Sequence, residues 1–479
     1  MIRLIRNEIY RIMHKKSTII FLIIALIYVL ITNIIYKKSD LLNSSTYYYN
    51  EYNYYDYGFA KDYINDNSPT EANASEYAGY KSYLDAYELA INYDKESWQY
   101  EKFMEEYRVV DNNYIYSTIY NYEEDILEYK QKLEEIKENI TNNNWKYFVN
   151  SEINDLNSDK KMYNELLNNT NNNDEIIYYK KELLKIDEQI KLNEYRITEN
   201  LCYGHDYLNT AIADIKNSLY GYAEYKISKN ADYKEDYINY QKDQYILKEK
   251  EDINNRQTLR GILINFFGEY SFLILVFVIM IAGGLVSEEF NKGTIKSLLI
   301  IPKKREKILL AKYLSAILFI PFIILVLLIS QLIIGGIFFG YSSLNIPVVV
   351  YNLAKEQIET VNVFKYFGLY CITSFPKILL LTTLAFACSV ILNNTAFSIA
   401  LTFCGIIGSD LINSFATYYE VKILNYFVTT NWNFSEFLFG GVSTFGNSLI
   451  HSIITCLVYL VIMIVTMFIV FRKKDVKNV

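Results

Sequence analysis

The stretch GLVSEEFNKGTIKSLLIIPKKREKILLAKY, at residues 284–313, joins two long apolar runs and decides how the rest of the chain is interpreted. Glu288 and Glu289 stand where the first of these runs ends, at a boundary between apolar and polar surroundings. A glycine and Thr294 follow, a pair that favours a helix break and a new helix with Thr294 as its candidate N-cap. The next apolar side chains are spaced as on one helical face: Ile295, Leu298, Leu299 and Ile301. Pro302 ends this segment, so the pattern predicts a short amphipathic helix lying across the membrane face.

Six apolar runs are long enough to cross a membrane. The first, Ser17–Tyr36, has 20 residues without a charge, and about 20 are needed to span roughly 30 Å of hydrocarbon. No small-residue cleavage site follows it, so we expect a retained anchor and not a signal peptide. The other five are Ile262–Val286, Ile308–Gly340, Tyr366–Leu392, Ala396–Ala416 and Asn447–Phe471. The predicted fold class is all-α: a six-helix polytopic membrane domain with a helical extracellular domain inserted between spans 1 and 2.

Charge is divided unevenly along the chain. Residues 37–260 hold 27 Lys/Arg and 43 Asp/Glu, a net charge of −16, whereas the rest holds 20 and 11, a net charge of +9. The long apolar runs lie outside residues 37–260, and they exclude a soluble globular enzyme. Basic residues cluster before the first span, between the second and third, and after the last. With six spans all three clusters fall on one side, which the positive-inside rule assigns to the cytoplasm.

These assignments predict four parts of the chain. They are a cytoplasmic amphipathic helix at 1–16, span 1 at 17–36, an extracellular domain at 37–260, and spans 2–6 at 261–479. The last part contains a cytoplasmic loop at 287–307 and a cytoplasmic C-terminal tail. The helix at 1–16 is inferred from a stripe of Ile2, Ile5, Ile9, Ile12 and Lys16. Its arginines lie largely off this stripe, as in a basic helix on the inner membrane surface.

The acidic segment 37–260 is expected to be mainly helical. Two stretches carry apolar side chains at steps of three and four: Ile126, Tyr129, Leu133, Ile136 and Ile140, and Ile176, Tyr179, Leu183, Ile186, Ile190 and Ile197, interrupted at Asn193. Such stripes predict antiparallel helical hairpins, with the Asn runs 142–144 and 168–173 as turns. The Tyr/Asn-rich stretch from about Asp40 to Tyr63 fits either seam filling between helices or a ligand groove. Cys202 is predicted to be a free thiol.

Several chemistries are excluded by residue counts. The chain has 3 His and 5 Cys, and four of the Cys lie in apolar runs, so no His-rich metal centre, zinc spacing or disulfide framework can be built. The phosphate-cradling motif G-x-x-x-x-G-K-[ST] does not occur, which means that the chain has no P-loop of its own. We therefore expect no catalytic residue, no metal and no cofactor on this chain.

The loop and the topology together resemble the permease subunits of ABC transporters of the type-2 exporter class. That family has an acidic pair, Gly-Thr, an apolar helix, Pro, a basic or polar turn and a Lys that opens the next span. The matching residues here are Glu288, Glu289, Phe290, Gly293, Thr294, Pro302 and Lys312. Sequence-level resemblance covers only about residues 1–40 and 280–315, whereas the topology matches over the whole chain. The extracellular domain resembles no domain that we can name.

The resemblance implies that the short helix after Thr294 is a coupling helix, which docks on a separate nucleotide-binding ATPase subunit. It also implies that the N-terminal helix packs beside that subunit. On this interpretation Glu289 faces the partner, and Glu289→Lys uncouples ATP hydrolysis from transport without unfolding the membrane domain. The alternative is an ordinary basic cytoplasmic loop.

Polar side chains inside the spans are costly and are therefore candidate functional positions. They are Glu269, Gln331, Lys377, Asp410 and His451. Glu269 and His451 also fit the outer membrane interface. Lys377 and Asp410 fall at equal depth on consecutive antiparallel spans, so an ion pair between them is one hypothesis. The alternative is that Lys377 snorkels outward alone while Asp410 faces a wet vestibule.

The expected function is that of a permease subunit of an ATP-driven exporter in a bacterial cell membrane. Its partners would be the ATPase subunit, which holds ATP and Mg, a second copy or a related permease, and membrane lipid, but no nucleic acid. Cationic antimicrobial peptides are the first candidate cargo, because an acidic extracellular domain attracts cations, and hydrophobic or lipid-linked compounds are the second. The competing class is a non-transporting membrane sensor or scaffold whose extracellular helices bind a ligand or partner.

Overall fold

The computed structural model of the chain describes residues 1–43, 57–294, 304–419 and 422–473. It divides into two compact units. The membrane unit contains residues 1–42 and 253–479, and the inserted unit contains residues 43–252. The boundaries predicted from the sequence, at 37 and 260, lie a few residues outside those of the inserted unit.

The membrane unit is built from helices and one short hairpin. Its elements are α1 (Ile2–Met13), α2 (Lys16–Asn43), α12 (Leu259–Ile264), α13 (Phe266–Gly284), α14 (Ser287–Asn291), α16 (Arg305–Phe339), η3 (Ser342–Asn345), β1 (Val348–Asn352), β2 (Gln357–Val361), α17 (Val363–Leu392), α18 (Thr395–Tyr419), η4 (Lys422–Tyr426), η5 (Phe434–Gly440) and α19 (Leu449–Lys473). Among the described residues, six helices are long and apolar enough to cross a membrane: α2, α13, α16, α17, α18 and α19. The predicted all-α, six-span fold class is confirmed.

The core of the membrane unit lies along α13 and α17, which pack against each other. In the most apolar 18-residue stretch of α13 and of α17, 61% of the residues are buried. In the corresponding stretch of α18 and of α19, 17% of the residues are buried. Aromatic contacts tie the neighbouring helices to this centre. The ring of Phe277 on α13 lies 4.8 Å from that of Phe21 on α2 and 6.1 Å from that of Phe319 on α16. Helices α18 and α19 therefore keep broad apolar faces that no other described residue covers.

A two-stranded hairpin adds to the predicted all-helical fold. Strands β1 and β2 pair antiparallel, with Val348 opposite Val361 and Asn352 opposite Gln357. The two residues before its first strand are held by Arg260, which is 3% exposed and donates to the carbonyls of Ile346 at 3.1 Å and Pro347 at 2.7 Å. The β-branched run Val348–Val350 favours a strand, a local signal within a fold that the sequence otherwise predicts to be all-helical.

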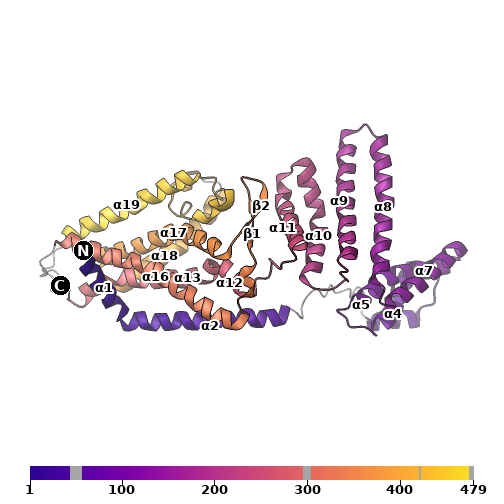
Figure 1. The fold of residues 1–479 in the computed structure, drawn as a ribbon, viewed down its shortest axis with the longest axis horizontal. Coiled ribbons are helices and arrows are strands. Elements are labelled where there is room, and N and C mark those ends of the chain that lie inside the picture. The colour runs from indigo at the N-terminus through magenta and orange to yellow at the C-terminus, as the bar shows by residue number, and fades with distance from the viewer. Residues whose placement is uncertain (44–56, 295–303, 420–421, 474–479) are drawn as a thin grey trace. The chain divides into compact units, whose positions relative to one another are not determined.

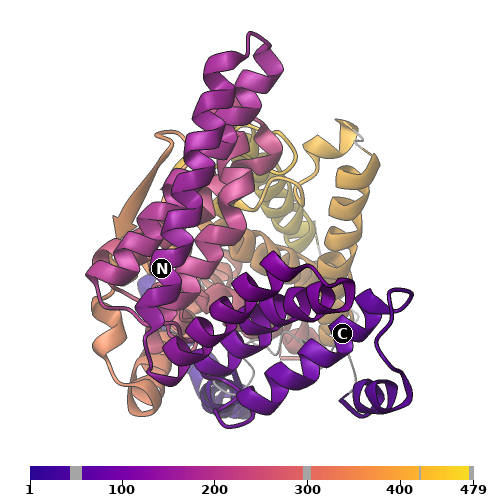
Figure 2. The same cartoon turned by 90° about the vertical axis from the view of Figure 1, so that its right-hand side faces the viewer.

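The inserted unit is helical throughout its described part. Its elements are α3 (Tyr57–Asp66), α4 (Ala74–Ala90), α5 (Trp98–Lys102), the π-helical turn η1 (Phe103–Tyr107), α6 (Arg108–Tyr120), α7 (Glu123–Thr141), α8 (Trp145–Asn169), α9 (Asn173–Thr198), α10 (Tyr207–Ser228), η2 (Ala231–Tyr233) and α11 (Lys234–Glu249). Figure 1 and Figure 2 show the hairpin of α8 and α9 and its neighbour of α10 and α11. The turns between α7 and α8 and between α8 and α9 fall in the predicted Asn runs.

The two apolar stripes face other helices, as predicted. Leu133, Ile136 and Ile140 on α7 are buried, and so are Ile186 and Ile190 on α9. These residues repeat at helical spacing. The three α7 residues belong to one apolar cluster, which Ile197 of α9 also contacts, whereas Ile186 and Ile190 belong to a second cluster. The thiol of Cys202 is free, as predicted.

Tyrosines fill several seams of the inserted unit. The rings of Tyr222 on α10 and Tyr240 on α11 stack with centroids 3.7 Å apart. The Tyr240 hydroxyl donates to Glu188 Oε2 at 2.5 Å, so it satisfies a carboxylate that is 5% exposed. The ring centroids of Tyr63 on α3 and Tyr80 on α4 lie 4.7 Å apart. In this part of the Tyr/Asn-rich stretch, tyrosine therefore fills a seam between helices. Residues 44–56 of the stretch lie outside the described residues.

Asp111 on α6 is a buried acid in the inserted unit. It is 5% exposed, and its Oδ2 atom has no hydrogen-bond partner among the described residues. Burial raises the pKa of Asp111 to about 7; nearby Asp85 adds to the rise and Lys81 opposes it. In the unfolded chain an aspartate has a pKa of about 3.9. Between these two values the folded protein retains a proton that the unfolded chain has released.

We therefore predict that the inserted unit loses stability as the pH rises from about 4 to about 7, with no further loss from this group above pH 7. Trp98 and Trp145 lie in its core, so tryptophan fluorescence of a Trp432→Phe chain in detergent reports urea unfolding of this unit. Asp111→Asn should flatten the pH dependence, whereas Asp155→Asn, at an exposed site on α8, should leave it intact. If stability fell equally steeply with pH in all three chains, Asp111 would not be the group that causes the pH dependence.

Candidate functional site

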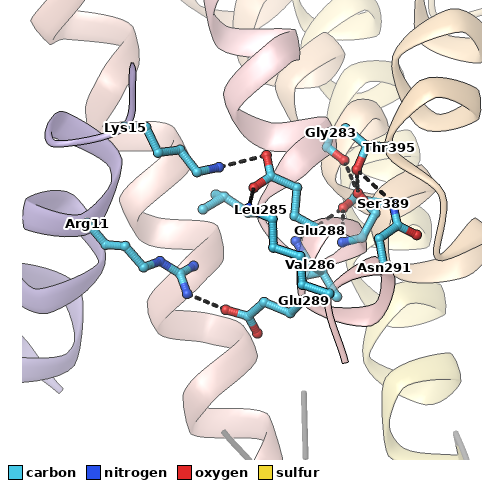
Figure 3. A network of polar contacts seen from close by, with 12 residues as sticks. Arg11, Lys15, Gly283, Leu285, Val286, Glu288, Glu289, Asn291, Ser389 and Thr395 are labelled. Carbon is cyan, nitrogen blue, oxygen red and sulfur yellow. Dashed lines mark hydrogen bonds and ion pairs between the residues drawn. The ribbon is translucent and has the colours of Figure 1, made fainter. Parts of the chain in front are cut away.

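The short helix α14 is anchored by the end of α17 and the start of α18. The backbone N–H groups of Val286 and Ser287 donate to Ser389 Oγ at 3.2 and 2.9 Å. The Ser287 hydroxyl donates to the Gly283 carbonyl at 2.6 Å and lies 2.8 Å from Thr395 Oγ1. These bonds satisfy backbone donors at the start of a new helix. They join α14 to two spans that are about 100 residues further along the chain (Figure 3).

Glu289 lies in an ion network that is buried except at Arg11, whose side chain is 43% exposed. Its side chain is 6% exposed, and Lys312 Nζ on α16 donates to its Oε1 at 2.7 Å. The Arg11 guanidinium on α1 donates to the same oxygen, as Figure 3 shows. Glu8 on α1 completes the group, because its Oε1 lies 3.1 Å from Lys312 Nζ and its Oε2 lies 2.7 Å from Arg11. Two carboxylates and two cations therefore balance, and we call these four residues the four-charge network.

Lys312 is the most deeply buried member, with a side chain that is 2% exposed. An ammonium group taken out of water is very costly unless it is paired, so the carboxylates of Glu289 and Glu8 are required where they stand. For Arg11, burial lowers the pKa, but the hydrogen bond to Glu289 and the charges of Glu8 and Glu289 outweigh it, and the pKa is raised. The charged state of Arg11 is thus stabilised by the two carboxylates beside it.

Glu288 faces a different direction. Lys15 Nζ donates to its Oε1 at 2.7 Å, and Lys292 Nζ lies 3.6 Å from its Oε2. Its side chain is 29% exposed. A Cβ atom on Gly284 would stand 2.6 Å from Glu288 Oε1, so glycine leaves room for this carboxylate. The acidic pair predicted from the sequence therefore joins α14 to α1 through Arg11 and to the turn between α1 and α2 through Lys15.

The sequence predicts that the helix breaks at the pair of Gly293 and Thr294. Gly293 has a φ of +68°, a conformation that glycine adopts without strain. Thr294 Oγ1 donates back to the Glu289 carbonyl at 3.5 Å, and the side chain of Phe290 is buried. The predicted amphipathic helix at 295–301 and Pro302 lie outside the described residues.

The position of Glu289 changes one expectation. The sequence led us to expect that it faces a partner protein, whereas the structure points its carboxylate inward at Lys312 and Arg11. Glu289→Lys would bring a third cation into this buried site, so the reversal is expected to destabilise the membrane unit and not to uncouple it cleanly. Glu288, with its partly exposed side chain, remains nearer to the surface.

Gln331 belongs to a second polar cluster, at the opposite end of the spans. Its Oε1 accepts from Asn33 Nδ2 at 2.9 Å and from the Tyr270 hydroxyl at 2.7 Å, and its Nε2 donates back to Asn33 Oδ1 at 3.0 Å. Glu269 accepts from the Tyr36 hydroxyl at 2.6 Å. These bonds link α2, α13 and α16, and interhelical hydrogen bonds of this kind contribute on average about 0.6 kcal/mol each.

Lys377 and Asp410 do not form the hypothesised ion pair. Within the described ranges no carboxylate oxygen lies within 4.0 Å of Lys377 Nζ. The ammonium group instead lies 5.4 Å from the ring centroid of Trp432, a cation–π distance. Asp410 is exposed on α18, although it is close enough to act on Lys377 electrostatically. His451 Nε2 lies 3.2 Å from the Asn425 carbonyl.

Three partners in these sites were missed from the sequence. Glu8 is the single acid among the first 39 residues, and Asn33 is a polar residue inside an otherwise apolar span; both were visible signals. Ser389 carried no signal, because a serine in a transmembrane helix usually bonds to its own backbone. No group of three His, Cys, Asp or Glu side chains in the part of the chain that the structure describes is arranged to hold a metal ion.

Residues 232–477, slightly more than half of the chain, match a family described as "Protein of unknown function (DUF2705)". The chain belongs to this family. The matched residues include α14 and α16 and exclude α1 and most of the inserted unit. No solved structure matches the chain.

Two relatives come from Bacillus subtilis (strain 168). The chain is 25% identical over 209 residues to the uncharacterized protein YhcI, covering 44% of this chain and 66% of YhcI. It is 26% identical over 220 residues to the uncharacterized membrane protein YdbK, covering 44% of this chain and 84% of YdbK. Six apolar helices and a membrane-protein relative identify the chain as a multi-pass membrane protein.

The four-charge network predicts a large penalty when one partner is removed. Lys312→Met strands two buried carboxylates with one cation, so we expect a loss of about 3–5 kcal/mol, seen as a lower unfolding temperature in detergent or as loss of monodisperse protein. Lys312→Met with Glu289→Gln leaves Glu8 balanced by Arg11 and should recover part of the loss.

Lys292→Met is the matched control, because it removes a lysine that is 68% exposed and 3.6 Å from Glu288. A surface pair of this kind contributes about 0–1 kcal/mol. If Lys312→Met cost no more than Lys292→Met, the network would not be holding the membrane unit together.

Proposed function

We propose that the chain is the permease subunit of an ATP-driven exporter of the ABC type-2 class. Its termini would be cytoplasmic and residues 37–260 extracellular. The basic clusters support this orientation, because α1, the start of α16 and the end of α19 lie together at one end of the membrane unit (Figure 1), and all three carry lysine or arginine. That end would face the cytoplasm.

The observation that carries the proposal is the attachment of α14 to three other parts of the membrane unit. The four-charge network joins it to α1 and α16, and Ser389 joins it to α17. Residues 295–303, where the resemblance implies a docking helix, follow α14 directly in the chain. A force applied to that segment by a partner would therefore reach several spans together and not one flexible loop.

The motor would be a separate ATPase subunit, since the sequence contains no P-loop. Closure of two such subunits around ATP and Mg would push on the coupling segment and rotate the spans as a rigid body. The faces that α18 and α19 leave uncovered are suited to lipid and to a second permease, which would complete a pathway. A homodimer or a pair with a related permease follows from this arrangement.

The cargo we propose first is a cationic antimicrobial peptide. The segment that forms the inserted unit has a net charge of −16 between residues 37 and 260, and a field of that sign concentrates cations near the surface. Export of such a peptide would give resistance to it. Hydrophobic compounds are the second candidate class.

The decisive experiment is purification of the tagged full-length chain from its native membrane. We expect an ATPase subunit that has a P-loop and no membrane spans to co-purify in a fixed ratio. Recovery of the chain without any such subunit would overturn the proposal and favour a sensor or scaffold.

A second prediction locates the contact. Replacing residues 295–302 by a Gly/Ser linker of equal length should abolish co-purification while the chain stays in the membrane. The control replaces residues 66–73, which are almost all exposed in the inserted unit, by the same linker, and it should retain the ATPase. Loss of the ATPase in both chains, or in neither, would refute docking at 295–302.

A further inference from the structure

An apolar groove opens on one side of the membrane unit. It has a volume of about 440 Å³ and lies between α17, α19 and η5, at the end of the unit opposite the four-charge network. Its walls include Phe375 and Leu380 from α17, Phe437 from η5, and Ile453 from α19. Its volume falls within the range of about 300–1,000 Å³ that is usual for small-molecule sites.

The lining offers almost nothing to a polar ligand. Among the described residues that line it, the polar side chains are Thr373 and Cys456, and both already donate to the protein. The Thr373 hydroxyl donates to the Leu369 carbonyl at 3.0 Å, and the Cys456 thiol donates to the Asn431 carbonyl at 3.5 Å. An extended peptide segment in the groove would leave its backbone N–H and C=O groups without partners, which costs several kcal/mol for each group. Hydrocarbon is therefore the chemistry that fits.

The groove has the length of one leaflet of a bilayer. On α19 it extends from Leu449, the first residue of the helix, to Leu460, which is about 16 Å along the axis at 1.5 Å per residue. Half of the roughly 30 Å hydrocarbon core is about 15 Å. The groove therefore begins at one membrane boundary and ends near the midplane.

The mouth of the groove is turned toward lipid. Ile372 on α17 is 71% exposed and Leu457 on α19 is 53% exposed, although both contribute to the lining. Apolar side chains exposed on helices that cross a membrane meet hydrocarbon chains. The groove alone cannot seat a second copy of this chain, because a stable protein interface buries about 800 Å² on each partner, far more than this narrow groove offers.

We propose that this groove binds one acyl chain of a membrane phospholipid, taken sideways from the leaflet at the η5 end of the bundle. The lining of the groove supplies the apolar contacts, and the headgroup stays at the boundary near Leu449. This site goes beyond the proposed transport function and does not depend on it, because it requires only that the six helices cross a bilayer.

The test uses the full-length chain in liposomes that contain a phosphatidylglycerol with a diazirine in the middle of one acyl chain. After illumination, mass spectrometry should find cross-links concentrated at residues 372–380 and 449–460. Excess unlabelled phosphatidylglycerol should suppress them, because the site is saturable. Cross-links spread evenly over all lipid-facing helices would overturn the proposal, and so would cross-links between two copies of the chain at these residues.

Ile453→Trp fills the groove and should lower the cross-linking yield about tenfold, the effect of excluding roughly two methylene groups. Ile454→Trp is the matched control, because Ile454 is 56% exposed and outside the lining, and its yield should not change. Leu380→Phe narrows the groove from the opposite wall and provides a second variant if Ile453→Trp does not fold. Equal cross-linking yields for Ile453→Trp and Ile454→Trp would overturn the proposed site.

Discussion

A buried ammonium group is the constraint on which the membrane unit depends. Lys312 opens the third span with a side chain that is almost fully enclosed, and it can remain charged there only beside carboxylates. Glu289 supplies one from the short helix α14, and Glu8 supplies the other from the N-terminal helix. The position of α1, the inward turn of Glu289 and the start of α16 all follow from this one requirement.

The two ends of the membrane unit have opposite chemistry, and this separation gives each end its proposed task. The end with α1 and α14 is held by charges and continues into residues 295–303, where a partner would push. The far end has the amide cluster of Gln331 and Asn33, the β-hairpin, and the apolar groove between α17 and α19. The long, well-packed helices α13 and α17 connect the ends, so a movement at one would be transmitted to the other.

Much of the fold could be predicted because its signals are local. A run such as Ser17–Tyr36 is a transmembrane helix by length and composition alone, and the α7 and α9 stripes reveal their buried faces by spacing. The site was harder, since a carboxylate at a membrane boundary can turn outward or inward. For Glu289 the choice is made by Lys312 and Arg11, which are distant in the chain. Lys377 shows the same limit. Its equal depth in the membrane suggested Asp410 as its partner, but its ammonium group lies over the ring of Trp432.

The most direct test of the account is hydrogen–deuterium exchange of the full-length protein in detergent, comparing the native chain with a Lys312→Met, Glu289→Gln chain. Without the two charges that join α14 and α16, α1 keeps its own helical bonds and its apolar packing through Ile12, but it loses its ionic contacts with Lys312 and Glu289. We predict faster exchange of the amides of residues 5–13, with no change in the core helix α13. Unchanged protection of residues 5–13 would contradict the claim that the four-charge network holds α1 to the membrane unit.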